Sequence, residues 1–513
     1  MADYLIGCDV GTSGAKSVLI DSEGAVLGSH YIEYPLITKR PGWAEQDPEW
    51  YWAAVADTIR ACISQSGADP AEIRGVSISA LSPACILVDD KLNPLQDSHI
   101  WMDRRGTKEA AMVKDLIGEE KVFEVSANPI DPFFATIKVL WEKNNRPDLY
   151  KKTYKVQTAA DYPRMKLTGK TVTDYSNASL FGICYNIIKK EWDYSLIEQL
   201  GLNAEIFPDT FPCDEVVGEV TAQAAERTGL KKGTPVVAGT VDAGAAYLAG
   251  GAVRDGDMSL TMGTAGCMGF VHSEPKFTKN MITIAHMANS RSMYVTNAAI
   301  VSCGALLKYF RDNFAQMEKV TAQSLGLDVY DLITLEAAEA PLGSDGLIVL
   351  PYFMGERTPI WDTNARGVLF GMSLAHKRGH IVRAFLEGAA YALYQNFRYI
   401  KESGVKMTIP LVLGEGGAKS ELWRQIISDV FNTPVVYMKQ SKGAPAGNAI
   451  NAGVGTGVFK DYSIALDWVS YTDRNEPDRA RHQQYMKYYE IFERLYGKVK
   501  DEYSALADAT GFN

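Results

Sequence analysis

Two similar glycine-rich segments stand about half the chain apart, and they constrain the fold more than any other feature. The first reads CDVGTSGAKSVLI over residues 8–20, and the second reads GDMSLTMGTAGCMGF over residues 256–270. In each segment a strand-like apolar run meets a Gly-Thr turn, and a second apolar run follows. The pattern predicts one hairpin in each half of the chain. It therefore indicates a duplicated architecture that grips one ligand from both sides.

The first of these turns matches no standard phosphate-loop pattern. The dinucleotide fingerprint G-x-G-x-x-G is absent, and a Walker loop would run from a strand into a helix, whereas residues 16–21 predict a second strand. Exposed turn amides, together with the hydroxyls of Thr12 and Ser13, can wrap an anion. Asp9 beside such a site would repel the anion unless a cation lay between them, which points to Mg²⁺. The alternative is an ordinary hairpin with a solvated aspartate.

A second acidic residue, Asp242, lies in an apolar segment rich in glycine and alanine, residues 236–253. The segment is long enough to raise the question of a membrane span, but a charge near its middle costs about 2.5–3.5 kcal/mol in a bilayer. We therefore expect a buried strand that runs into a tightly packed helix, with Asp242 at the junction. An aspartate at this position can act as a base or cap the helix, and the two roles are compatible.

Composition and charge narrow the class of protein. The 513-residue chain is too long for a single core, so two large domains are expected. A net charge of -10 without a basic block argues against nucleic acid as a partner. The seven cysteines are scattered without a C-x-x-C pair, which favours buried thiols over a metal site. The start of the chain shows no cationic leader, so we expect a cytoplasmic protein without a membrane partner.

A third glycine cluster reads GEGG over residues 414–417, between a strand-like run and the helical segment Glu421–Phe431. A strand–glycine–helix junction offers free backbone amides and close backbone approach, which nucleotides require. Near the C-terminus, residues 481–501 carry aromatic side chains at helical spacing. This spacing predicts a helix packed on a core, with the seam of a homodimer as the alternative.

Five segments resemble the FGGY family of carbohydrate kinases, the group of glycerol kinase, xylulokinase and gluconokinase. They are residues 9–16, 159–179, 237–246, 352–372 and 414–435. Each match is modest evidence, whereas five in family order across both halves are specific. The resemblance implies an α/β protein with the two-domain, actin-like ATPase (ribonuclease H-like) fold, duplicated, with an ATP cleft between the domains. We place the N-terminal domain at residues 1–246 and the C-terminal domain at residues 247–513.

The resemblance also implies an activity and a role for individual residues. The chain would be an ATP-dependent phosphotransferase that moves the γ-phosphate to a hydroxyl of a small sugar or polyol. Asp242 would be the catalytic base, and Asp9 and Asp242 would hold Mg²⁺ through water. The ATP contacts would be Gly11, Thr12, Ser13, Lys16, Gly263, Thr264, Gly304, Lys308, Gly416, Gly417 and Glu421. The sugar pocket would be formed by Ser82, Pro83, Trp101, Asp103 and Asp242.

The predicted sugar pocket departs from the patterns of individual family members. Xylulokinase has a Met-His pair where this chain has Ser82 and Pro83, and glycerol kinase has an Arg-Glu pair there. Glycerol kinase also has Gln where this chain has Ala243, and Asn near the adenine ribose where this chain has Glu421. Core packing is the alternative role for Trp101.

The substrate that we favour is a ketopentose such as D-xylulose, with gluconate, a pentitol or another pentulose as alternatives. An alternative from another class is an actin-like ATPase of chaperone type, which binds a polypeptide. The stretch GERTPIWD, residues 355–362, is typical of the sugar kinases and favours the kinase.

Overall fold

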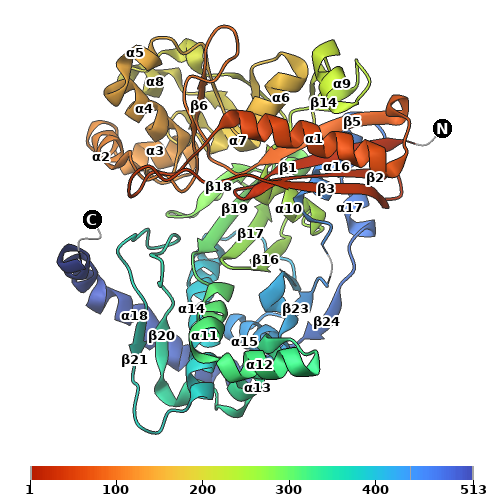
Figure 1. Ribbon diagram of the computed structural model, residues 1–513. Coiled ribbons are helices and arrows are strands. Elements are labelled where there is room, and N and C mark those ends of the chain that lie inside the picture. The colour runs from red at the N-terminus through yellow and green to blue at the C-terminus, as the bar shows by residue number, and fades with distance from the viewer. Residues whose placement is uncertain (1–2, 440, 511–513) are drawn as a thin grey trace. The chain divides into compact units, whose positions relative to one another are not determined.

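The computed structural model describes residues 3–439 and 441–510, and it contains two compact units (Figure 1). The first unit comprises Met1–Arg254, Val271–Val295 and Lys442–Val469. The second comprises Asp255–Phe270, Thr296–Ser441 and Ser470–Asn513. The domain boundary at residue 246 stays a prediction, because the units follow contacts rather than chain order. Among the described residues, no helix has both the length and the apolar character that crossing a lipid bilayer requires.

A mixed sheet forms the centre of the first unit. Its strands run in the order β13-β14-β5-β1-β2-β3, with β15 beside β5. Strand β1 is antiparallel to β2 but parallel to β5, and β14 and β15 are also parallel to β5. The strands are β1 (Tyr4–Val10), β2 (Gly14–Asp21), β3 (Val26–Glu33), β5 (Ile73–Ala80), β13 (Val216–Glu219), β14 (Pro235–Val237) and β15 (Thr240–Val241).

Helices cover both faces of this sheet. Helix α1 (Pro48–Ser66) packs on β2 and β3, and α16 (Gly443–Gly455) packs on β1 and β5 (Figure 1). Helix α16 approaches β1 closely because Gly7 has no side chain, since a Cβ there would lie 1.8 Å from the carbonyl oxygen of Pro445. Around them lie α6 (Asp161–Thr168), α9 (Ala222–Thr228), α10 (Asp242–Ala249) and α17 (Ile464–Asp467).

The remainder of the first unit is a layer of short helices and paired short strands with its own apolar core. The helices are α2 (Thr107–Leu116), α3 (Glu119–Ser126), α4 (Ala135–Asn145), α5 (Pro147–Tyr150), α7 (Tyr175–Ser179) and α8 (Tyr194–Gln199). The strand pairs are β4 (Glu45–Gln46) with β7 (Ser98–His99), β6 (Ile86–Val88) with β8 (Lys155–Gln157), β9 (Val172–Asp174) with β12 (Asp209–Phe211), and β10 (Tyr185–Asn186) with β11 (Glu191–Trp192). Strand β18 (Ile282–Ala285) also falls in this unit.

The second unit contains the other hairpin, in a second sheet in which the strands β19, β17, β16, β22, β23 and β24 follow one another in that order. Strand β16 is antiparallel to β17 and parallel to β22. The strands are β16 (Met258–Met262), β17 (Gly266–His272), β19 (Tyr294–Ile300), β22 (Leu411–Gly414), β23 (Val435–Tyr437) and β24 (Thr472–Asn475), and β20 (Ile348–Leu350) pairs separately with β21 (Val368–Phe370). The helices are α11 (Gly304–Phe314), α12 (Gln316–Leu325), α13 (Val329–Glu339), α14 (Arg378–Glu402), α15 (Glu421–Phe431) and α18 (Arg479–Thr510).

Several local predictions agree with these elements. Both hairpins form, with turns between β1 and β2 and between β16 and β17. Asp242 is the first residue of α10, directly after β15. The aromatic segment near the C-terminus is helix α18, in which Tyr485, Tyr489 and Phe492 are buried and contact the ring of Tyr391 on α14. These aromatic side chains therefore pack on a core, as the preferred interpretation had it.

Candidate active site

Three parallel strand ends bring the two predicted acidic residues to one edge of the first sheet. In the register of the sheet, Asp9 of β1 and Thr240 of β15 both lie opposite Ser79 of β5. Asp242 follows two residues after Thr240, at the start of α10. Since β5 separates β1 from β15, two strand spacings place the two backbones roughly 10 Å apart. Side chains from both can therefore reach a common ligand.

Asp242 has the environment of a base that works near neutral pH. Its side chain is partly exposed, and its Oδ1 accepts a hydrogen bond of 2.7 Å from the backbone N–H of Ala243. Burial, and then the negative charge of Asp9, raise the pKa of Asp242 to about 7. A carboxylate with such a pKa can accept a proton from a hydroxyl and release it again at physiological pH.

Asp9 is held by a relay of hydrogen bonds that the sequence did not reveal. The hydroxyl of Ser79 donates to Oδ1 of Asp9 at 2.6 Å, and the side-chain amide of Asn448 donates to that hydroxyl at 2.6 Å. Burial raises the pKa of Asp9 to about 6, while Ser79 and then Lys16 act to lower it. Lys16 lies opposite Asp9 in the β1–β2 hairpin. The available signal for Asn448 was that it is one of two amides, with Asn451, in a segment of otherwise small and apolar residues.

The turn of residues 11–14, which is predicted to bind phosphate and is named the first phosphate loop, is fixed by side chains from outside the hairpin. The loop closes on itself through a bond of 2.9 Å from the N–H of Gly11 to the carbonyl of Gly14. The Tyr34 hydroxyl donates to the carbonyl of Gly11 at 2.5 Å, and the Gln46 amide donates to the carbonyl of Thr12 at 2.8 Å.

The indole N–H of Trp101 also bonds the hydroxyl of Thr12, at 3.0 Å. Trp101 therefore links the predicted sugar pocket directly to the first phosphate loop.

The two aspartates fit an Mg²⁺ ion as a ligand pair. Two partly exposed carboxylates face one site, and each has its pKa raised by the protein around it, so a cation there would relieve their repulsion. Mg²⁺ prefers one or two carboxylates, completed by water and phosphate oxygens. Over residues 3–439 and 441–510, no group of three or more His, Cys, Asp or Glu side chains forms an all-protein metal site.

The predicted sugar residues take different positions in the structure. Ser82 is partly exposed after the end of β5, and its hydroxyl donates to Oδ1 of Asn177 at 3.1 Å. Pro83 is buried beside it, and Trp101 is partly exposed. Ser82 and Trp101 are therefore accessible to a ligand, while Pro83 contributes to the shape of the loop.

Asp103 differs from the other predicted sugar residues because its carboxylate is already fully engaged within the protein. Its side chain is 1% exposed. It accepts hydrogen bonds of 2.7 Å from the backbone N–H of Ala44 and 2.6 Å from Nη2 of Arg105, which also bonds Glu45 at 2.8 Å. This geometry favours a role in anchoring residues 101–105, which we call the Trp101 segment. Direct binding of a sugar hydroxyl by Asp103 stays a prediction, and these contacts do not support it.

A cavity of about 290 Å³ in the second unit gathers most of the residues predicted for the nucleotide. We call it the second-unit pocket. Its lining includes Gly263, Thr264, Gly304, Lys308, Gly416 and Gly417. Glu421 is not among the residues that line it, so its predicted role near the ribose gains no support from the geometry.

The sequence missed one wall of this pocket, which is supplied by Asp328, Tyr330, Asp331 and Thr334 at the start of α13. None of these residues belongs to a glycine-rich motif of the kind that identified the other nucleotide contacts. They reach the site only through the folding of the chain.

The turn of residues 263–266, which is likewise predicted to bind phosphate and is named the second phosphate loop, is fixed by the backbone at the start of α11. The N–H groups of Cys303 and Gly304 donate to the carbonyls of Thr264 and Gly263, at 2.9 and 2.8 Å. Close approach requires a glycine at residue 304, because a Cβ there would lie 2.5 Å from the carbonyl oxygen of Gly263. The N-terminus of α11 is therefore locked onto this loop.

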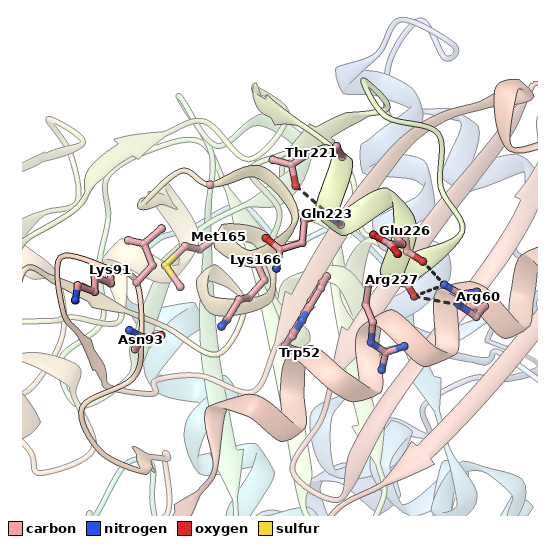
Figure 2. A pocket seen from close by; sticks show the side chains of 14 residues that line it. Trp52, Arg60, Lys91, Asn93, Met165, Lys166, Thr221, Gln223, Glu226 and Arg227 are labelled. Carbon is pink, nitrogen blue, oxygen red and sulfur yellow. Dashed lines mark hydrogen bonds between the residues drawn. The ribbon is translucent and has the colours of Figure 1, made fainter.

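A larger groove, of about 850 Å³, lies on the first unit between α1, α6 and α9 and contains none of the predicted site residues (Figure 2). Two of its basic side chains are already engaged within the protein. Arg60 donates to the carbonyls of Glu226 and Arg227, and Lys166 pairs with Glu49 at 2.8 Å.

Comparison with known proteins agrees with this geometry. Models of the N-terminal and C-terminal domains of the FGGY family of carbohydrate kinases match residues 4–249 and 258–456. The chain is similar to a xylulose kinase of Bacillus subtilis (29% identical, 98% of both chains) and to a gluconokinase of the same species (30% identical, 99% of this chain and 98% of the relative). It is also similar to the crystal structure of a xylulose kinase from Rhodospirillum rubrum, with a TM-score of 0.88, 28% identity, and 98% and 100% of the two chains covered.

Proposed function

Because the chain belongs to the FGGY family of carbohydrate kinases, we propose that it transfers the γ-phosphate of ATP to a hydroxyl of a ketopentose such as D-xylulose. Phosphoryl transfer from ATP to a small sugar is the activity of the family. Membership of this family therefore favours a kinase over the chaperone-type ATPase. The arrangement that carries the proposal is the pair Asp9 and Asp242 at one sheet edge, beside the first phosphate loop.

In this proposal Asp242 accepts the proton of the sugar hydroxyl as the new O–P bond forms and the bond to the ADP oxygen breaks. The amides of the first phosphate loop, with Thr12 and Lys16, orient the phosphate and offset its charge. Asp9 and Asp242 would hold Mg²⁺, which supplies positive charge to the phosphate oxygens when bound. The adenosine part of ATP is assigned to the second-unit pocket.

The charges around the predicted sugar pocket favour a neutral sugar over gluconate. Gluconate carries a carboxylate, which a selective site would meet with a cation. On the Trp101 segment, Arg105 is bonded to Asp103 and Glu45, and Arg104 is paired with Asp131. These arginines are therefore engaged within the protein. Gluconate stays a second candidate because of the similarity to a gluconokinase.

A coupled assay of ADP release distinguishes these substrates. We expect the highest kcat/KM with D-xylulose when it is compared with D-ribulose, xylitol and gluconate under the same conditions. A gluconate value above that of every ketopentose would replace the proposed substrate.

The role of Asp242 is tested by Asp242→Asn, which keeps the shape and removes the proton acceptor. We expect kcat to fall at least about 100-fold, with ADP affinity little changed. The matched control is Asp461→Asn, at an exposed aspartate of the same unit, which should leave kcat unchanged. Wild-type turnover by Asp242→Asn would reject the assignment of the base.

A further inference from the structure

Glu356 is a buried acid in the GERTPIWD stretch to which the proposed mechanism gives no role. It is 4% exposed, and its Oε1 accepts hydrogen bonds of 2.7 Å from the N–H of Val301 and 2.8 Å from the N–H of Arg357. Two residues further on, the Thr358 hydroxyl accepts a bond of 2.7 Å from the N–H of Ala299. The N–H groups of residues 299 and 301, at the end of β19, are therefore held by the side chains of residues 358 and 356. In both segments the residues involved are two positions apart, as the period of a strand requires.

The amides held in this way belong to the segment that fixes the second phosphate loop. Val301 lies two residues before Cys303 and three before Gly304, whose N–H groups bond the carbonyls of Thr264 and Gly263. Helix α11 begins at Gly304, and its first turn lines the second-unit pocket. A shift at Val301 would therefore move both the loop and one wall of the pocket.

The other end of the stretch is tied to helix α18. The backbones of Glu356 and Asp362 exchange hydrogen bonds of 2.8 and 3.0 Å. The Tyr496 hydroxyl of α18 donates to Oδ2 of Asp362 at 3.0 Å. The backbone of Glu356 is therefore held in place through Asp362 and helix α18. This support allows its side chain to set the position of Val301.

The second carboxyl oxygen of Glu356, Oε2, is buried and has no hydrogen-bond partner among the described residues. Burial raises the pKa of Glu356 to about 8, although the amides of Arg357 and Val301 and the Arg357 charge act to lower it. Burial raises the pKa of the Cys303 thiol and that of the Tyr352 hydroxyl, and the charge of the Glu356 carboxyl adds to both shifts. Well below pH 8 the side chain is therefore mostly neutral, so the unpartnered oxygen carries no full charge.

We propose that Glu356 is a positioning residue that fixes the segment 301–304, and through it the second phosphate loop, for nucleotide binding. The inference rests on the proposed assignment of ATP to the second-unit pocket. It concerns geometry, since Glu356 is not proposed to touch the nucleotide.

Calorimetric titration of the full chain with ADP tests the inference through two substitutions. Glu356→Ala leaves the N–H of Val301 without its acceptor, and we expect ADP binding to weaken about tenfold, with the KM for sugar little changed. Glu356→Gln keeps an acceptor oxygen of the same shape and should restore ADP binding to within about twofold of wild type. Glu402→Gln, at an exposed glutamate of the same unit, is the matched control and should bind ADP as wild type does.

Thermal unfolding across pH provides a readout that applies even if Glu356→Ala does not fold. The folded pKa of about 8 lies above the ordinary value of 4.5, so the wild type loses stability as pH rises from 4.5 to 8. Glu356→Gln lacks this loss. The Tm of Glu356→Gln minus that of wild type should therefore rise between pH 5 and pH 8 and level off above pH 8, while Glu402→Gln should show no such trend.

The outcomes separate the inference from its premise. A wild-type protein that does not bind ADP would overturn the pocket assignment, and the inference with it. If the wild type binds ADP, equal affinity in Glu356→Ala, or a failure of Glu356→Gln to restore binding, would overturn the positioning role alone. A Tm difference that is flat from pH 5 to pH 8 would overturn the neutral state of Glu356.

Discussion

The two phosphate loops have similar sequences but are held in place by different means. In the first loop, the side chains of Tyr34 and Gln46 donate to the carbonyls of Gly11 and Thr12. In the second loop, the backbone N–H groups of residues 303–305 donate to the carbonyls of residues 263 and 264. In both cases carbonyl oxygens of the loop accept hydrogen bonds from groups outside the turn. These partly negative oxygens are therefore directed away from a bound phosphate.

The difference predicts which substitutions each loop tolerates. The first loop depends on the identity of side chains that lie far away in the sequence. The second depends on the absence of a side chain at Gly304 and on the position of α11. Asp9 accompanies only the first loop, so any metal requirement should be linked to that loop alone.

The largest expected effect tests this asymmetry through the metal. Asp9→Asn should raise the Mg²⁺ concentration needed for half activity about 10–100-fold, which is typical for the loss of a carboxylate that orients metal-bound water. Titration of kinase activity with Mg²⁺ at saturating ATP and sugar measures it. Thr264→Ala in the second loop is the matched control, and it should raise the KM for ATP without changing the Mg²⁺ requirement. Equal Mg²⁺ curves for Asp9→Asn and wild type would remove Asp9 from the metal site.

An intermediate effect is expected at the second loop. Gly304→Ala places a Cβ against the carbonyl oxygen of Gly263. This oxygen belongs to the backbone, so it cannot move away as the end of a flexible side chain could. Overpacking of this kind costs about 1–3 kcal/mol, so we expect the KM for ATP to rise about tenfold. Gly497→Ala on α18, where a Cβ meets no atom within 4 Å, should leave the KM unchanged. A wild-type KM in Gly304→Ala would show that the second loop does not depend on this contact.

The smallest effect is expected from a side chain that braces the first loop. Gln46→Met preserves the approximate length but removes the donor to the Thr12 carbonyl, and we expect the KM for ATP to rise about fivefold and the Tm to fall. Tyr51→Phe removes a different bond, the 2.9 Å contact to Oε1 of Gln46, and should lower the Tm while leaving the KM unchanged. If both variants changed the KM equally, the bond from Gln46 to the loop would not be the cause.

Much of the local structure could be predicted because its causes are local. Turn glycines and alternating apolar residues identified both hairpins, and the same reasoning placed Asp242 at a strand–helix junction. The helix over Glu421–Phe431 was predicted with the bounds that the structure shows. The glycine cluster was predicted as a nucleotide wall, and Gly416 and Gly417 do line the second-unit pocket.

The roles of individual polar residues were harder to predict. Asp103 stands in a segment whose composition allows a sugar contact, but its carboxylate is buried against Ala44 and Arg105. Asn448 bonds Ser79, which lies 369 residues away in the chain. Nothing in the local sequence around either residue specifies such a partner.

The sequence by itself determined the hairpins, the strand–helix junction at Asp242 and the kinase family, because turn chemistry, hydrophobic period and motif order are written in short segments. Only the tertiary structure decided that Ser79 and Asn448 hold Asp9, that Gln46 and Trp101 brace the first loop, and that Glu356 holds the segment behind the second. These contacts join residues tens to hundreds of positions apart. They exist because sheet register and helix packing place the residues together, and neither is encoded by any one of the segments that meet.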